Sequence, residues 1–130
     1  MKIGGKMNKK ILVIDDEELI VKSLAKLLEK TGFEVVIIKR GQDAIAIVEE
    51  ENFDLLISDI RMPGMDGIEA VRNILNTFEQ KKSPKPAVIF ITGYADKESE
   101  QRAKSLNPAA YIYKPFDIST LVEKINEVLK

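Results

Sequence analysis

The sequence predicts an α/β fold, a single doubly wound (βα)5 domain with a five-stranded parallel sheet. Short apolar runs alternate five times with segments of helical periodicity along the 130 residues. The apolar runs are nearly continuous, which is typical of parallel strands buried on both faces. Strands joined through helices of this length form right-handed βαβ units, so helices should cover both faces of the sheet. The length suits one domain with one sizeable core.

The first half of the chain contributes three of the expected strands and two helices. The strands are expected at Lys10–Ile14, Phe33–Ile38 and Asp54–Ser58, and the helices at Glu17–Lys30 and Gln42–Glu50. Thr31-Gly32 is a stop signal for the first helix. We expect that helix to pack on the sheet through one apolar face, made of Ile20, Leu24, Leu27 and Leu28.

The second half continues the alternation of helices and strands. A third helix is expected at Gly67–Phe78, with an apolar face made of Ile68, Val71, Leu75 and Phe78. The polar, proline-bearing stretch Gln80–Pro86 predicts a loop. Strands should follow at Ala87–Ile91 and Ala109–Tyr113. Asp117 can cap a last helix, whose buried face is expected to consist of Ile118, Leu121, Val122, Ile125 and Leu129.

One predicted helix, Asp96–Leu106, differs from the others. Only Ala103 and Leu106 are apolar in it. A helix with so narrow an apolar face is weakly anchored and belongs among the less stable parts of a structure. It is either a solvated surface helix or a mobile element used for switching.

The composition excludes several kinds of site. The formal net charge is -1 and no basic stripe is present, so direct nucleic-acid binding is not expected. The chain contains neither cysteine nor histidine, which removes disulfides, the usual general base and the usual zinc ligands. A metal site must therefore use oxygen ligands, which favours Mg²⁺ or Ca²⁺. Any reaction step that uses a histidine side chain, including one through phosphohistidine, must take place on another molecule.

The beginning of the chain is basic and lacks the apolar segment of a signal peptide. Residues 1–8 are expected to be a flexible N-terminal arm or a cloning remnant, placed before a domain that covers residues 9–130. No apolar run is long enough to span a membrane. We therefore expect no membrane partner and a cytoplasmic location.

Charged and hydroxyl side chains stand where four of the expected strands end. They are Asp15 and Asp16 after the first strand, Asp59 after the third, Thr92 after the fourth and Lys114 after the fifth. In an open α/β sheet, ligands bind outside the carboxyl ends of the strands, so these groups should meet at one edge. Three carboxylates, one hydroxyl and one ammonium make a site for a hard cation and a phosphoryl group.

The acidic residues also have simpler interpretations. Asp16 taken alone would serve as a helix N-cap as readily as a ligand, but capping does not explain an acidic run that continues through Glu17 and Glu18. Asp66 is expected to cap a helix rather than to bind a ligand. Asp59 is different, because a carboxylate can be a nucleophile toward a phosphoryl group.

These residues together resemble the response-regulator receiver domain of two-component signal transduction. The resemblance covers about residues 9–130 and is carried by Asp15-Asp16, Asp59-Ile60-Arg61-Met62-Pro63-Gly64-Met65-Asp66-Gly67, Thr92-Gly93 and Lys114-Pro115-Phe116. Their combined order and spacing are highly specific, although each piece alone is not. The resemblance implies a flavodoxin-like receiver fold with strand order 2-1-3-4-5. One departure is Asn107-Pro108-Ala109-Ala110, where many family members have a Gly-Ala pair before the fifth strand.

The resemblance also implies a phosphoacceptor and a metal site. Asp59 would be the phosphoacceptor. Asp16, Asp59 and the backbone carbonyl of Arg61 would ligate Mg²⁺, and Asp15 would contribute largely through water.

Further roles implied by the resemblance concern the phosphoryl group once it is bound. Thr92 and Lys114 would bind phosphoryl oxygens, and Tyr111 would be the switch residue that rotates inward with Thr92. Arg61 and Tyr94, two positions beyond the phosphoacceptor and the threonine, would influence the dephosphorylation rate.

The implied function is a phosphorylation-activated signalling switch rather than an enzyme acting on other substrates. A sensor histidine kinase or a histidine phosphotransfer protein would supply the phosphoryl group. The surface made by the fourth helix, fifth strand and fifth helix would then change, and it would control an effector or formation of a homodimer. The sequence does not decide between a stand-alone receiver and part of a larger regulator or hybrid kinase.

Two other readings share features with the chain. Haloacid-dehalogenase-like phosphatases also combine an aspartate nucleophile, Mg²⁺ and a lysine, but their second Asp, two residues after the nucleophile, is Arg61 here, and no cap domain is evident. A flavodoxin-like flavin binder shares the sheet order. Its first loop must cradle a phosphate, and the acidic run at residues 15–18 would repel one.

Overall fold

A computed structural model of the chain describes residues 9–130, and the expected N-terminal arm at residues 1–8 lies outside the described residues. Five strands and five helices alternate in it: β1 (Lys10–Ile14), α1 (Glu18–Lys30), β2 (Glu34–Ile38), α2 (Gly41–Glu50), β3 (Leu55–Asp59), α3 (Gly67–Lys81), β4 (Ala87–Thr92), α4 (Lys97–Lys104), β5 (Ala110–Tyr113) and α5 (Ile118–Val128). The strands form one parallel sheet in the order β2-β1-β3-β4-β5. The predicted fold is confirmed.

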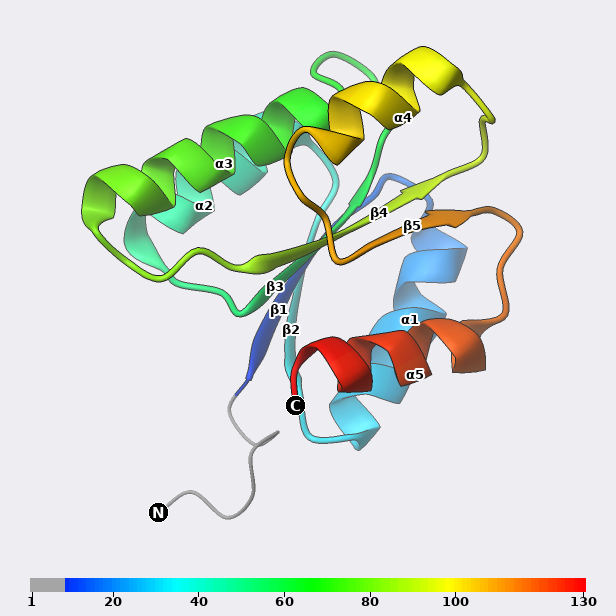
Figure 1. Cartoon of the computed structure of the whole chain (residues 1–130). Helices are drawn as coiled ribbons and strands as arrows, with labels where there is room; N and C mark the ends of the chain where they lie inside the picture. The colour runs from blue at the N-terminus through cyan, green and yellow to red at the C-terminus, as the bar shows by residue number, and fades with distance from the viewer. Residues whose placement is uncertain (1–8) are drawn as a thin grey trace.

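The sheet separates two apolar layers (Figure 1). Helices α2, α3 and α4 lie over one face, and α1 and α5 lie over the other. Successive residues of a strand point to opposite faces, so Leu12 and Ile14 join the first layer while Ile11 and Val13 join the second. This double burial explains the nearly continuous apolar runs of β1, β3 and β4.

The two edge strands, β2 and β5, are less buried than the three central strands. In β5 the first three residues are half-buried, and Tyr113 is exposed. In β2, Ile37 is exposed as well. Among the residues that the structure describes, each of these strands has a neighbour on one side only. The apolar runs predicted buried strands, and for the fifth strand this prediction is wrong, because β5 lies at the edge of the sheet.

The buried face of α1 is rotated from the predicted one. Leu24 and Leu28 are buried as expected, but Val21 and Ala25 accompany them. Leu27 is 38% exposed. The helix has more apolar residues than one face can bury, and its packing on the sheet selects the stripe. In α3, similarly, Ile74 is fully buried and Leu75 only packs at the margin.

Helix α3 also continues beyond its predicted end, through Gln80 and Lys81, which were expected to belong to a loop. The Lys81 ammonium donates to the Val48 carbonyl oxygen at 2.5 Å and to Asn52 Oδ1 at 2.8 Å. These bonds tie the last turn of α3 to the end of α2. The helix then ends at Lys82, whose φ of 59° is left-handed.

Helix α4 is short, and Ala103 is its single buried residue. Polar contacts hold it to its neighbours. Arg102 donates to Asp66 Oδ2 at 3.1 Å, and the Tyr113 hydroxyl donates to Glu100 Oε1 at 3.0 Å. The narrow apolar face predicted from the sequence is thus observed, and charge and hydrogen bonds supplement the little apolar burial that this helix has.

Candidate functional site

The register of the sheet brings the predicted site residues to one edge. Ile14 at the end of β1 is paired with Ser58, Asp59 with Ile91, and Thr92 with Tyr113. Asp15 and Lys114, which directly follow β1 and β5, therefore flank the ends of β3 and β4. Backbone bonds continue this alignment past the strands, since the Lys114 N–H donates to the Thr92 carbonyl oxygen at 2.7 Å.

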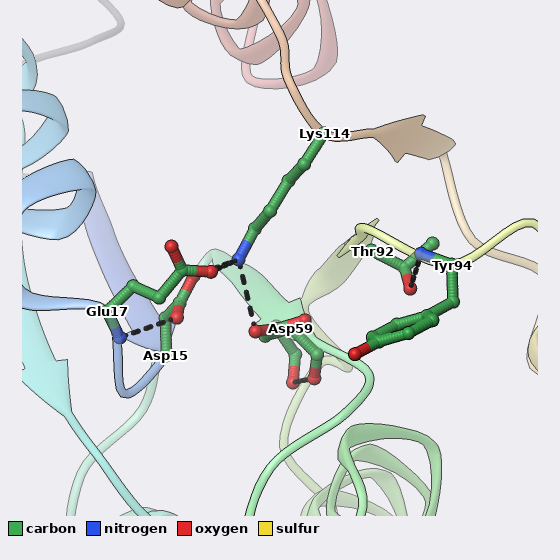
Figure 2. A network of polar contacts seen from close by, with 7 residues as sticks. Asp15, Glu17, Asp59, Thr92, Tyr94 and Lys114 are labelled. Atoms are coloured by element: carbon green, nitrogen blue, oxygen red, sulfur yellow. Dashed lines mark hydrogen bonds and ion pairs between the residues drawn. The ribbon is translucent and has the colours of Figure 1, made fainter.

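Three carboxylates and one ammonium meet at this edge (Figure 2). Oxygens of Asp15, Glu17 and Asp59 all lie within 4.8 Å of one another. The Lys114 side chain reaches into this group from the end of β5. Its Nζ lies 3.1 Å from Asp59 Oδ2 and 3.5 Å from Asp15 Oδ2, and it also forms an ion pair with Glu17 Oε1.

The charges of the site are unbalanced, and the pKa values reflect this. Burial and then the neighbouring Asp15 charge raise the pKa of Asp59 to about 6, although Lys114 acts against them. Burial likewise raises the pKa of Asp15. Burial alone would lower the pKa of Lys114, but the bond to Glu17 and the charges of Asp15 and Asp59 outweigh it and raise that pKa. Three carboxylates facing one ammonium would gain from a divalent cation.

Among the predicted metal ligands, the structure brings Asp15 and Asp59 together but leaves Asp16 exposed and outside the group. The N-cap position of α1 is Glu17, so Asp16 is not the helix cap either. Glu17 takes the place beside the other carboxylates. In the sequence, Glu17 stands out only as part of an acidic run, and its position directly at the start of α1 is the one signal that could have singled it out.

The turn after Asp59 is shaped by two glycines and a cap. Gly64 has a φ of +82°, a region that favours glycine. Gly67 packs against the backbone of Asp59 so closely that a Cβ would lie 1.8 Å from the Asp59 carbonyl oxygen. Asp66 accepts from the Glu69 N–H at 2.8 Å and caps α3, as expected. Asp117 caps α5 in the same way.

Arg61 and Tyr94 form a stacked pair beside the site. The guanidinium carbon of Arg61 lies 4.0 Å from the centroid of the Tyr94 ring. Arg61 also approaches Asp96, the N-cap of α4, at 3.9 Å. The Tyr94 ring extends from the end of β4 back toward Asp59 (Figure 2). Both side chains are mainly exposed, so the pair lies at the surface of the site.

Thr92 and Tyr111 lie on neighbouring strands. Thr92 is buried, and its Oγ1 accepts from the Tyr94 N–H at 3.2 Å. The Tyr111 ring packs against Phe90, with 6.4 Å between centroids, and against Tyr113, with 5.4 Å. Within residues 9–130 the buried Tyr111 hydroxyl has no hydrogen-bond partner. A buried hydroxyl without a partner costs free energy, so this side chain has reason to adopt another position.

The arrangement can carry out phosphoryl-transfer chemistry at Asp59. The carboxylate is a possible nucleophile, and the neighbouring acids offer oxygen ligands to a hard cation. Lys114 and Thr92 can neutralise and hydrogen-bond phosphoryl oxygens.

Comparison with known proteins agrees with this geometry. The sequence matches the family model of the response regulator receiver domain over residues 11–126. It is 30% identical over 123 residues to the polar-differentiation response regulator DivK of Brucella ovis, covering 95% of this chain and 98% of that protein.

Solved structures show the same similarity. A CheY-like response regulator receiver domain protein from Methanospirillum hungatei is 34% identical, with a TM-score of 0.82 and 94% of each chain covered. The chemotaxis protein CheY4 of Vibrio cholerae is 29% identical, with a TM-score of 0.80, and 94% of this chain and 99% of that one are covered.

Proposed function

Because the chain belongs to the response regulator receiver domain family, we propose that it is a signalling switch turned on by phosphorylation of Asp59. The observation that carries the proposal is the setting of this carboxylate. Asp59 ends β3 at the sheet edge, lies beside Asp15 and Glu17, and has the Lys114 ammonium 3.1 Å from its Oδ2.

In the proposed reaction, an oxygen of Asp59 attacks the phosphorus of a phosphohistidine on a sensor kinase or a histidine phosphotransfer protein. A P–O bond forms, the P–N bond breaks, and the imidazole nitrogen keeps the electron pair. Lys114 neutralises a phosphoryl oxygen, and Thr92 donates a hydrogen bond to another. The chain acts on its own phosphorylation and dephosphorylation only, so we do not consider it an enzyme for other substrates.

The acidic cluster fits Mg²⁺, which prefers oxygen ligands and neutralises phosphoryl charge when it is bound. The proposed ligands are Asp15, Asp16, Asp59 and the backbone carbonyl of Arg61. Asp15 and Asp59 are already directed at one point, whereas the exposed Asp16 would have to turn inward.

Arg61 and Tyr94 are proposed to set the lifetime of the phosphoryl group. Their stacked pair is exposed, and the Tyr94 ring extends toward Asp59, so the pair can limit the approach of water. The link from Arg61 to Asp96 extends the pair to the first turn of α4.

Partners are proposed to bind the surface formed by α4, β5 and α5, either as a downstream effector or as a second copy of the chain. This surface includes Tyr111 and the weakly anchored α4. We propose no nucleic-acid contact by this chain. Among residues 9–130, no helix has the length and apolar character needed to cross a bilayer.

The test is phosphorylation by a small donor. In Mg²⁺ and acetyl phosphate, the wild type should gain one phosphoryl group, detected as an intact-mass increase that hydroxylamine removes. Asp59→Asn should not gain it, because the nucleophile is lost, whereas Asp43→Asn on the exposed side of α2 should react like the wild type. Equal labelling of Asp59→Asn would contradict the assignment, unless peptide mapping placed the group on the neighbouring Ser58.

A further inference from the structure

Glu17 is the one member of the acidic group to which neither the sequence nor the proposed reaction gives a task. Its Oε1 is paired with the Lys114 ammonium, which also contacts Asp59 and Asp15. An ammonium group has three donors, and in this arrangement three different carboxylates surround it.

The backbone directs the Glu17 side chain toward the lysine. Glu17 is the N-cap residue of α1 and is extended, with φ of -87° and ψ of 94°, but its side chain makes no capping bond. Asp15 Oδ1 instead accepts from the Glu17 N–H at 2.9 Å and fixes the backbone there. The Glu17 carboxylate is thus free of the helix and available to Lys114.

Exposure distinguishes Glu17 from the other two partners of the lysine. The side chains of Asp15 and Asp59 are 5% and 7% exposed, and that of Lys114 is 12% exposed. The Glu17 side chain is 50% exposed. Water can replace the lysine at Glu17 at little cost, whereas the buried aspartates would lose the neighbouring positive charge in a place that water solvates poorly.

We propose that Glu17 is a positioning residue for Lys114, holding its ammonium beside Asp59 until a phosphoryl group arrives and then releasing it. A phosphoryl oxygen on Asp59 requires one of the three lysine donors. Of the three carboxylates, Glu17 releases its lysine donor most readily. Glu17 and the phosphoryl group therefore compete for Lys114. This inference rests on the proposed function, because the competitor is the phosphoryl group on Asp59.

The experiment measures the dissociation constant of beryllofluoride, a phosphoryl mimic, in saturating Mg²⁺ by ¹⁹F NMR. Glu17→Gln removes the competitor and should bind beryllofluoride about two- to fivefold more tightly, the range expected for a partly exposed ion pair. Glu17→Asp keeps the charge but is one methylene shorter and loses its reach to Lys114, so it should also bind more tightly.

Glu18→Gln is the matched control. Glu18 is the next residue and pairs with Lys39 on the surface, so its removal takes away the same charge without touching Lys114. Its affinity for beryllofluoride should equal that of the wild type. The Mg²⁺ affinity of Glu17→Gln, measured by calorimetry, should stay close to that of Glu18→Gln.

Three results would overturn the inference alone. Equal binding of beryllofluoride by wild type and Glu17→Gln would exclude competition. Wild-type behaviour of Glu17→Asp would show that charge, not contact, matters. A loss of about tenfold or more in Mg²⁺ affinity in Glu17→Gln, absent from Glu18→Gln, would assign Glu17 to the metal instead. Failure of the wild type to bind beryllofluoride would overturn the proposed function as well.

Discussion

At the residue scale, Asp59 is a carboxylate in a place that disfavours its charge. It is buried, and Asp15 lies beside it. Its pKa is about 6, against an ordinary value of 3.8. The proposed function explains why a carboxylate is placed here. Water solvates the buried Asp59 and Asp15 carboxylates poorly, so they are ready to interact with a bound cation and phosphoryl group.

This raised pKa leads to a prediction about stability and pH. Between pH 3.8 and about 6 the folded chain holds a proton that the unfolded chain has lost. The free energy of unfolding therefore falls as the pH rises through this window, and the loss persists above it. Asp59→Asn avoids the loss and should be more stable than the wild type at pH 7, by on the order of 1–3 kcal/mol. Thermal unfolding without divalent cations should show this gain at pH 7 and almost none at pH 4.

The metal site gives a second prediction at this scale. Binding of Mg²⁺ to the folded state should stabilise the wild type and raise its melting temperature. At a Mg²⁺ concentration of about 100 times the dissociation constant, the gain in free energy of unfolding should be roughly 2.7 kcal/mol. Asp16→Asn should lose most of this response, and Asp43→Asn should keep it. If Asp16→Asn responds to Mg²⁺ as the wild type does, Asp16 is not a ligand, and the cation is held by the carboxylates that the structure already groups.

At the scale of elements, the sequence predicts strands better than helix faces. Strands buried on both sides leave nearly continuous apolar runs, and the predicted β1 has its observed ends at Lys10–Ile14. Helix α1 offers apolar residues on a wider arc than it can bury. Sequence alone does not tell whether Ile20 and Leu27 or Val21 and Ala25 face the sheet, because packing against the other elements decides it.

The site shows the same division between what is predictable and what is not. The convergence of Asp15, Asp59, Thr92 and Lys114 follows from strand ends in a parallel sheet, which the sequence reveals. Which acid of the run after β1 turns inward depends on the backbone angles at the start of α1. Those angles direct Glu17, and not Asp16, toward Lys114.

The junction of β3 and α3 gives a prediction for one element. Gly67→Ala should destabilise the fold by about 1–3 kcal/mol, because its Cβ would overlap the Asp59 carbonyl oxygen and force the helix start away. Chemical denaturation should show the loss. Gly93→Ala is the control in the same region. A Cβ at Gly93 would meet no described residue within 4 Å, so this variant should unfold like the wild type. Equal stabilities for the two variants would contradict the close approach at Gly67.

At the scale of the whole molecule, β4 and β5 connect the site to the surface proposed for partners. Thr92 lies at the edge near Asp59, and Tyr113 is its register partner on β5. Two residues earlier, Phe90 is paired with Tyr111, whose ring contacts both Phe90 and Tyr113. Helix α4 lies beside them with one buried residue and a hydrogen bond from Tyr113 to Glu100. A small rearrangement at Thr92 can therefore be passed on to α4, a helix with little apolar burial to oppose its movement.

We predict that phosphorylation of Asp59 shifts this region between two arrangements. Thr92 would turn toward the phosphoryl group. Tyr111, whose buried hydroxyl has no hydrogen-bond partner within residues 9–130, would rotate into the space beside Thr92. Amide hydrogen exchange with and without beryllofluoride should change across residues 93–113, while the interior of β1 stays protected. Thr92→Ala should still be phosphorylated on Asp59, but the exchange difference in α4 and β5 should largely disappear, because the hydroxyl that links the two sites is gone.

A difference confined to the loop after Asp59 in the wild type would exclude the switch. An unchanged exchange difference in Thr92→Ala would instead show that the coupling bypasses Thr92 and runs through another contact, such as the stack of Arg61 on Tyr94 and its link to Asp96.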